Sequence, residues 1–296
     1  MRIRPTAARL VTLGALALVI AACTGASDDA TPPPAPAPAP APSEPAAPTD
    51  PDADATDVVA VYVVRSAPTT FFVEPIPVRV PAFGDAVSAR VTAAVEALLE
   101  LTETGDAELF TSVPAGTTLH RVSVDGDVVT LDVSGAIVGS SGSSAQELTF
   151  AQQLAHTARV DEAIGAIVLL IDGQPIDELW GHLDWSGPVA VDPFILSPVT
   201  VTTPLPDEEV PVGPVTFRGQ ATVFEATVLV TLLDADGEVL EDGFVTATTG
   251  APGRGTWEWT VTLPGPGEFT VVAAESDPSE GEGRPPFATT RTVRAG

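Results

Sequence analysis

Lysine is absent from this sequence of 296 residues, and its 13 basic residues are all arginines. They face 40 acidic residues, so the formal net charge is −27 at pH 7. A charge of this sign repels nucleic-acid phosphates and anionic lipid headgroups, and the arginines beyond residue 60 are scattered singly. The composition therefore predicts no nucleic-acid partner and no electrostatic contact with a membrane surface.

Cysteine occurs once, as Cys23, which excludes a disulfide within the chain. Without covalent cross-links, the folded parts must be stabilised by their hydrophobic cores. A chain of this length is expected to form two domains of ordinary size.

Familiar catalytic motifs are also missing. The sequence contains no Gly-x-Ser-x-Gly elbow, phosphate-binding loop, dinucleotide fingerprint or His-Glu-x-x-His. Ser134 and residues 140–144 lie in a Gly/Ser-rich stretch without a partnered base, so they give little support to a hydrolase. No two of the three histidines have the spacing of a metal site: His120, His156 and His182. We therefore predict that the chain is not an enzyme and needs neither a metal nor a cofactor.

The amino-terminal segment has the order of an export signal. Residues 1–9 carry three arginines, and residues 10–22 form an uncharged apolar run that is short for a membrane span. The run ends in Ile-Ala-Ala before Cys23, and this junction resembles the lipobox of bacterial lipoproteins. The resemblance implies cleavage after residue 22 and lipidation of the Cys23 thiol. The alternative is an ordinary cleaved signal in which the cysteine is incidental.

We therefore predict a lipoprotein signal peptide over residues 1–22. The mature protein would be extracytoplasmic. Fatty acyl chains on Cys23, palmitate among them, would hold it in the cell membrane, because two or more chains anchor a protein stably. Membrane lipid is thus its first predicted partner.

A linker rich in proline and alanine follows over residues 23–57. It has no apolar periodicity and cannot build a core. Proline favours extended polyproline II, so we expect a semi-rigid stalk of roughly 100 Å at about 3.1 Å per residue. A proline-rich recognition ligand is the alternative, but the run lacks the flanking basic residues of such ligands.

Three strands are expected in the first folded segment from their apolar and β-branched runs. They cover residues 58–65, 70–80 and 164–171. Pro75 and Pro77 interrupt the second of these, which predicts an edge or bulged strand.

Two helices are expected between these strands. Apolar residues at helical spacing predict a helix over residues 86–101, with Gly105 as its stop. Ser144 and Glu147 have the spacing of a capping box that opens the second helix. Its buried face is predicted to consist of the following residues: Leu148, Ala151, Leu154, Ala155 and Ala158.

A hairpin is predicted where residues 119–124 and 128–133 flank Asp125-Gly126-Asp127, because Asp-Gly favours a tight turn. With the other elements, it makes residues 58–187 an α+β domain in which two helices pack on one face of a mixed sheet.

Short alternating strands separated by turns fill residues 193–296. Seven strands in about a hundred residues predict an all-β immunoglobulin-like sandwich, because each strand must hide its apolar face against a second sheet. They are expected over residues 199–203, 215–223, 227–233, 238–248, 256–263, 268–274 and 287–293. Trp257 and Trp259 lie on one face of a strand by period two, and we interpret them as core or sheet-face residues.

Two acidic segments are candidates for binding. Residues 234–238 offer carboxylates on a turn and form the better calcium candidate, but a hairpin turn at Asp236-Gly237 explains them more simply. Residues 275–282 are interpreted as a solvated acidic loop.

Several stretches resemble a GerMN domain, a module of bacterial sporulation and germination proteins. They are Val-Pro-Ala-Gly-Thr at residues 113–117, the hairpin strands, the helix through residue 158, and Val-Leu-Leu-Ile-Asp-Gly-Gln-Pro-Ile at residues 168–176. GerMN modules resemble ring-building domains of envelope-spanning complexes, which implies assembly rather than catalysis.

The second segment resembles the immunoglobulin-like domain that accompanies GerMN in bacterial lipoproteins. The motifs that carry the resemblance include Ser197-Pro198, Phe224-Glu225-Ala226 and Asp236-Gly237. The pairing of both domains is more specific than either one alone.

The leading hypothesis is a non-catalytic envelope lipoprotein that acts as a binding or assembly module on an envelope protein partner. The resemblance relates it to sporulation or germination. A surface module for wall glycan or calcium is the alternative, suggested by the acidic turns and the two tryptophans. An envelope hydrolase is the third and weakest.

Overall fold

The computed structural model describes residues 56–296, except residues 69, 105, 140–141 and 278–284. The predicted signal peptide, Cys23 and nearly all of the predicted linker lie outside the described residues. All described residues belong to a single compact unit of the chain. None of the helices in this part is long and apolar enough to cross a bilayer.

The first sheet contains three strands in the order β2-β1-β3. The long strands β1 (Thr56–Ser66) and β2 (Phe71–Pro81) pair antiparallel along their whole length, and the short β3 (Leu109–Phe110) joins the other side of β1. The prolines of β2 lie in an edge strand whose register has no bulge. This confirms the edge position that the prolines predicted.

The second sheet is mixed. β4 (Leu119–Asp125) and β5 (Val128–Val133) form the predicted hairpin, in which Gly126 has a φ of 62°. β6 (Ala166–Ile171) lies parallel to β5, and the short strands β7 (Gln174–Pro175) and β8 (Val189–Ala190) pair antiparallel with β6.

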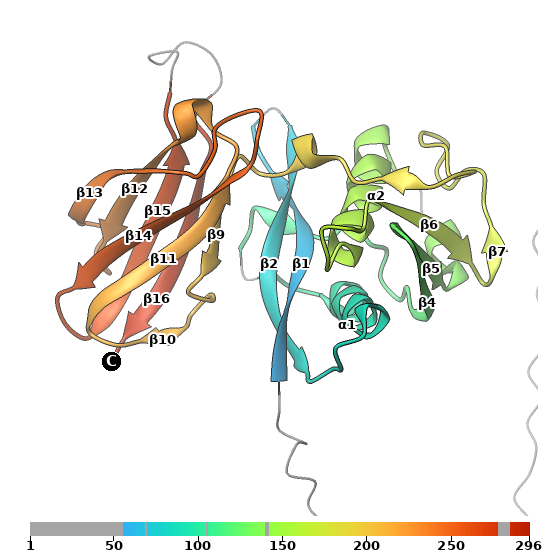
Figure 1. Cartoon of the computed structure of the whole chain (residues 1–296), viewed down its shortest axis with the longest axis horizontal. Coiled ribbons are helices and arrows are strands. Elements are labelled where there is room, and N and C mark those ends of the chain that lie inside the picture. Colours follow the sequence, from blue (N-terminus) through green and yellow to red (C-terminus); the bar gives the residue numbers. More distant parts are fainter. Residues whose placement is uncertain (1–55, 69, 105, 140–141, 278–284) are drawn as a thin grey trace, which may run out of the picture. The chain divides into compact units, whose positions relative to one another are not determined.

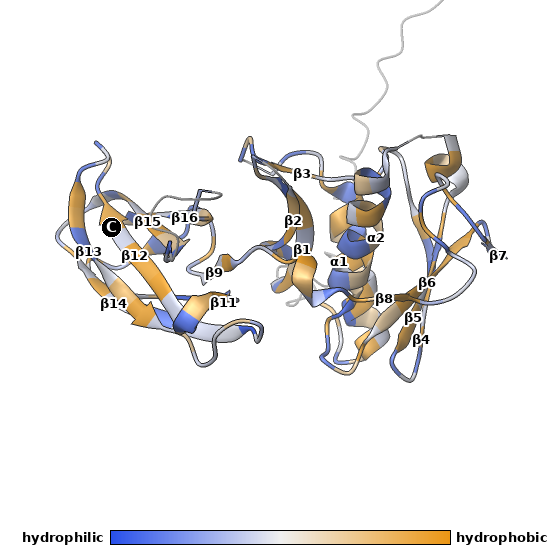
Figure 2. Ribbon diagram, turned by 90° about the horizontal axis from the view of Figure 1, so that it is seen from above, coloured by the Kyte–Doolittle hydropathy of each residue, from blue (hydrophilic) through white to orange (hydrophobic). Residues whose placement is uncertain are grey.

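Two α-helices, α1 (Val87–Glu100) and α2 (Ser144–Ala158), lie between these sheets, with β1 and β2 on one side and β4, β5 and β6 on the other (Figures 1 and 2). The α+β fold class is confirmed, but the strands form two sheets where the sequence predicted one. The reason is α2, which is buried on all sides from Thr149 to Ala158, and a single sheet covers only one side of a helix.

Both helix boundaries differ slightly from the prediction. α1 ends at Glu100 because Leu101 is extended, and the predicted stop at Gly105 lies outside the described residues. In α2, Ser143 rather than Ser144 is the N-cap, and it forms the capping box with Gln146. The capping box was therefore predicted one residue too late. Glu147, which the prediction placed in the box, is not part of it.

Leu148 was predicted on the buried face of α2, but it is 41% exposed. The neighbouring Glu147 is fully buried instead, because the segment around Trp180 and Trp185 covers the first turn of the helix on that side.

The second half of the chain is a sandwich of two sheets, ordered β10-β16-β15-β12-β13 and β14-β11-β9. All seven predicted strands are present: β9 (Val199–Thr203), β11 (Gly213–Ala221), β12 (Thr227–Leu233), β13 (Val239–Thr246), β14 (Gly255–Leu263), β15 (Gly267–Glu275) and β16 (Ala288–Ala295). The sequence did not predict β10 (Glu209–Val210), whose two residues pair parallel with β16 and are too few to show a period. The all-β immunoglobulin-like fold is confirmed.

A buried carboxylate links the two halves. Glu74 of β2 accepts hydrogen bonds from Arg65 in its own sheet and from Ser197 and Thr289 of the sandwich. Burial opposes the charge of Arg65, but the hydrogen bonds and the charge of Glu74 outweigh it and raise the pKa of the guanidinium. Because Glu74 is 5% exposed, these donors are essential to its burial.

Candidate functional site

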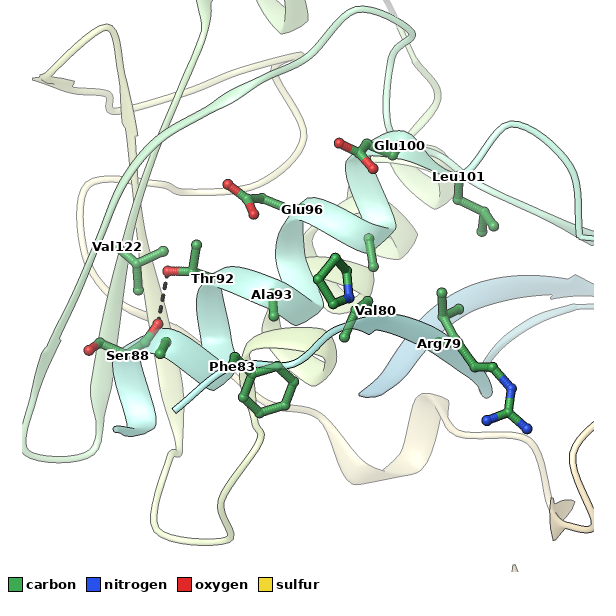
Figure 3. Close-up of a pocket in the computed structure, with 14 residues that line it drawn as sticks. Arg79, Val80, Phe83, Ser88, Thr92, Ala93, Glu96, Glu100, Leu101 and Val122 are labelled. Carbon is green, nitrogen blue, oxygen red and sulfur yellow. Dashed lines mark hydrogen bonds between the residues drawn. The ribbon is translucent and has the colours of Figure 1, made fainter. Parts of the chain in front are cut away.

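A groove of about 720 Å³ lies where the end of β2, the outer face of α1 and one residue of β4 meet (Figure 3). Apolar and small side chains form most of its lining. They are Val78, Val80, Pro81, Phe83, Ala89, Ala93, Ala97, Leu101 and Val122.

The groove exists because α1 offers small side chains where it faces the end of β2. Ala89, Thr92 and Ala93 are only half-buried, and none of them is large enough to reach the strand. The Thr92 hydroxyl donates to the Ser88 carbonyl oxygen at 2.8 Å, so it is turned back onto its own helix. At one end, Phe83 is held in place because its backbone N–H donates to Asp57 at 3.0 Å.

The charged groups of the groove lie at its rim. Glu96 and Glu100 are exposed on α1, and the exposed Arg79 comes from β2 (Figure 3). The lining residues include no histidine and no cysteine. Such a surface can bind an apolar segment with polar flanks.

The chain matches two family models in tandem. Residues 60–177 match the family described as "Sporulation and spore germination", and residues 198–282 match the "Immunoglobulin-like domain of bacterial spore germination". This chain carries both spore-germination domains. The GerMN and immunoglobulin-like resemblances in the sequence are thereby confirmed.

Three of the solved structures that match this chain cover about half of it. The tandem GerMN domains of the sporulation protein GerM from Bacillus subtilis are 19% identical, with a TM-score of 0.38 and 50% of each chain covered. The first GerMN domain of the same protein is 16% identical, with a TM-score of 0.33, 46% of this chain and 96% of that chain covered. A candidate lipoprotein from Clostridium perfringens is 21% identical, with a TM-score of 0.33 and coverages of 46% and 87%. No curated protein matches the chain significantly.

The three histidines of the GerMN domain lie apart and have separate roles. His156 is buried in α2, and its Nε2–H donates to the Asp192 carbonyl oxygen at 2.9 Å. Burial lowers its pKa to about 4, so the ring is neutral at pH 7. His182 contacts the Gly142 carbonyl oxygen at 3.2 Å. His120 is exposed, and no cluster of three potential metal ligands occurs in the described part of the chain.

Glu147 is the most enclosed carboxylate of the GerMN domain. It is fully buried, and its two oxygens accept hydrogen bonds from the backbone N–H groups of Trp180 and His182 and from the Trp185 indole at 2.9 Å. All three donors belong to one loop, so Glu147 fixes this loop against α2. Sequence reasoning assigned Glu147 to the cap and missed this role, because the donors are more than 30 residues away in the chain.

The acidic turn of the immunoglobulin-like domain forms the predicted hairpin between β12 and β13. The Asp234 carboxylate accepts hydrogen bonds from the backbone N–H groups of Asp236 and Glu238 at 2.9 Å, and Gly237 has a φ of 80°. Residues 234–238 therefore form a hairpin turn, which was the simpler of the two interpretations. Residues 278–282 of the second acidic segment lie outside the described residues.

The paired tryptophans face the interior of the sandwich, as the sequence predicted. Trp257 is 3% exposed and Trp259 packs on the same core. Trp257 lies opposite Gly219, where a Cβ would approach the indole to 2.7 Å, so glycine is needed beneath the ring. Neither face of this indole is available for stacking on a sugar.

The serines have structural contacts where they are described. Ser134 accepts a hydrogen bond from the Thr118 N–H at 3.0 Å, and Ser143 caps α2. Ser140 and Ser141 lie outside the described residues, and Ser144 begins α2. The groove, in contrast, was missed from the sequence. Its only signal was the small, half-polar outer face of α1.

Proposed function

We propose that this chain is a non-catalytic envelope lipoprotein of the sporulation and germination type, which assembles with an envelope protein through the groove of its GerMN domain. The observation that carries the proposal is the groove of about 720 Å³, which is apolar along its floor and charged only at its rim. Its family match relates the chain to sporulation and germination.

The composition of the groove supports binding rather than turnover. Apolar pockets bind by excluding water, and a few polar groups at the rim fix the register of the partner. Glu96 and Glu100 on one side and Arg79 on the other offer such groups. A partner segment with an apolar centre and a basic group facing Glu96 and Glu100 would match this pattern.

Site-specific photo-crosslinking in the native envelope tests the assembly role. A benzoylphenylalanine at Ala89, inside the groove, is compared with one at Ala136, an exposed residue outside it. We expect one reproducible envelope protein to crosslink at position 89 and not at position 136. The same mixture of neighbours from both positions would contradict the proposal.

A matched pair of substitutions sharpens this test. Ala89→Trp fills the groove, and Ala136→Trp adds the same side chain elsewhere. With a crosslinker placed at Thr92, the first change should abolish the adduct and the second should leave it intact.

The membrane anchor is proposed from the sequence, with Cys23 as the lipidated residue. Cys23→Ser should move the protein out of the membrane fraction, and mass spectrometry should find an acylated amino terminus in the parent protein. A Cys23→Ser chain that stays in the membrane, or an intact unmodified leader in the parent, would contradict the anchor. The groove test would still stand.

A further inference from the structure

One sheet of the immunoglobulin-like domain ends in a strand with a single neighbour. β13 pairs with β12 and is the last strand of the order β10-β16-β15-β12-β13 (Figure 1). Seven of its eight residues are exposed, and Val245 is half-buried. Within the described part of the chain, no strand pairs with its other edge.

The backbone of this edge is oriented for further pairing. Ala247 donates its N–H to the Ala226 carbonyl oxygen at 2.8 Å, so this group points toward β12. Successive residues of a strand direct their backbone groups to opposite sides. The N–H and C=O groups of Asp242, Phe244 and Thr246 therefore point away from β12, toward the free edge.

An apolar row leads across the outer face of the sheet to this edge. Phe244 lies opposite Leu229, Leu229 lies opposite Ala274, and Ala274 lies opposite Ala288. Phe244 is 69% exposed and Leu229 is 41% exposed, although both are large apolar side chains. A strand added beside β13 would extend this row by one position and cover Phe244.

Carboxylates surround the same strand. Glu241 and Asp242 lie on β13, and the turn before it carries Asp234, Asp236 and Glu238. None of the five takes part in an ion pair with a described residue. The strand thus combines free backbone groups and apolar side chains with unbalanced negative charge.

We propose that the free edge of β13 binds an extended segment of a partner protein in which basic and apolar residues alternate. Main-chain hydrogen bonds to Asp242, Phe244 and Thr246 would add the segment to the sheet as a sixth strand. Its apolar side chains would cover Phe244, and its basic side chains would lie on the opposite face, toward Glu241. Alternation is required because successive side chains of a strand point to opposite faces.

Charge selects this occupant over a second copy of the chain. Two copies would each bring a net charge of −27 and the carboxylates of β13 to the same edge. The same carboxylates attract a basic segment and repel a second copy. The surface belongs to the sandwich, so the inference does not depend on the groove of the GerMN domain.

The test uses the detergent-solubilised full chain and a fluorescent eight-residue peptide that alternates lysine and valine. Three further peptides separate the contributions of charge, apolar contact and backbone hydrogen bonding. One replaces lysine with glutamate, one replaces valine with serine, and one is N-methylated at every residue so that neither edge of its backbone can donate. Binding is followed by fluorescence anisotropy, and self-association by sedimentation.

Two substitutions target β13 and one serves as a control. Thr246→Pro removes an N–H from the free edge and leaves the ladder to β12 intact, and Glu241→Lys reverses the charge. Glu162→Lys makes the same reversal on an exposed loop of the other domain. We expect the lysine-valine peptide to bind the parent chain and the Glu162→Lys control equally. Binding should weaken about tenfold or more in the other two variants and with each altered peptide.

Equal binding of the N-methylated peptide, or unchanged binding by Thr246→Pro, would overturn strand addition and leave only charge attraction. Failure of the lysine-valine peptide to bind would also overturn it. Self-association of the parent chain that Thr246→Pro abolishes would make a second copy the occupant and refute the basic partner.

Discussion

The two helices of the GerMN domain are neighbours of nearly equal length, 14 residues in α1 and 15 in α2, but they use their polar residues in opposite ways. α1 is amphipathic, with a buried face around Val91 and Val95 and an outer face that lines the groove. α2 is buried all round from Thr149 to Ala158.

The polar side chains of α2 are hydrogen-bonded inside the domain. Gln153 bridges the Tyr62 carbonyl oxygen and the Ser112 N–H, Gln152 bridges Ala190 and Asp192, and Thr157 accepts from Tyr62. They satisfy backbone groups that the surrounding strands and loops leave open. The enclosed helix α2 therefore supports the fold with its polar side chains, whereas α1 leaves an open groove along its outer face.

The largest effect should come from Glu147→Ala, which removes the fully buried carboxylate of α2. Three N–H groups, among them the buried Trp185 indole, would lose their acceptor, and we expect a loss of about 4 kcal/mol in the free energy of unfolding. Urea denaturation measures it. Glu147→Gln keeps one acceptor oxygen and should lose less. A loss below about 1 kcal/mol in Glu147→Ala would contradict the role of this carboxylate.

A pH effect should follow from His156. Burial lowers its pKa to about 4 in the folded state, while the unfolded state has an ordinary value near 6.5. The unfolded chain therefore binds more protons between these values. The stability contributed by the neutral ring is complete above pH 6.5 and is lost as the pH falls toward 4.

Between pH 7 and pH 4.5 the His156 contribution should fall by about 2–3 kcal/mol. His156→Gln has no titrating ring, so the difference between parent and variant isolates this contribution from that of the carboxylates. Urea denaturation at both pH values measures it. Identical pH dependence of parent and variant would show that His156 does not titrate as its burial requires.

Within α2, replacing a buried polar residue should cost more stability than replacing an exposed apolar one. Gln153→Leu removes the fully buried amide that bonds the part-buried Ser112 N–H and Tyr62 carbonyl oxygen, and we expect a loss of about 2 kcal/mol. The neighbouring Leu148→Gln, at an exposed position, should change the stability by less than about 0.5 kcal/mol. Thermal unfolding compares the two. Equal effects would mean that α2 is not held by its polar contacts.

The smallest effect on stability should come from Ala89→Trp on the outer face of α1. The position is half-buried and borders open space, so the free energy of unfolding should change by less than about 0.5 kcal/mol. Crosslinking to a partner through the groove should nevertheless be lost. A large destabilisation would indicate that this face of α1 is part of the core.

Many of the elements could be predicted from local signals. The Asp125-Gly126 turn, the prolines of β2 and the alternating strands of the sandwich each carry their own signal in neighbouring residues. The capping box was misplaced by one residue because Ser143 and Ser144 both fit a cap, and only the packed helix distinguishes them.

The element types, the order of the two domains and the absence of familiar catalytic motifs could all be read from the sequence, since they depend on periodicity, turn chemistry and residue type over short stretches. The two sheets that enclose the helices, the burial of Glu147 by Trp180 and Trp185, and the edge position of β13 became apparent only from the folded chain. The physical reason is that burial depends on which distant surfaces meet. A side chain's own neighbours in the chain do not show what will cover it.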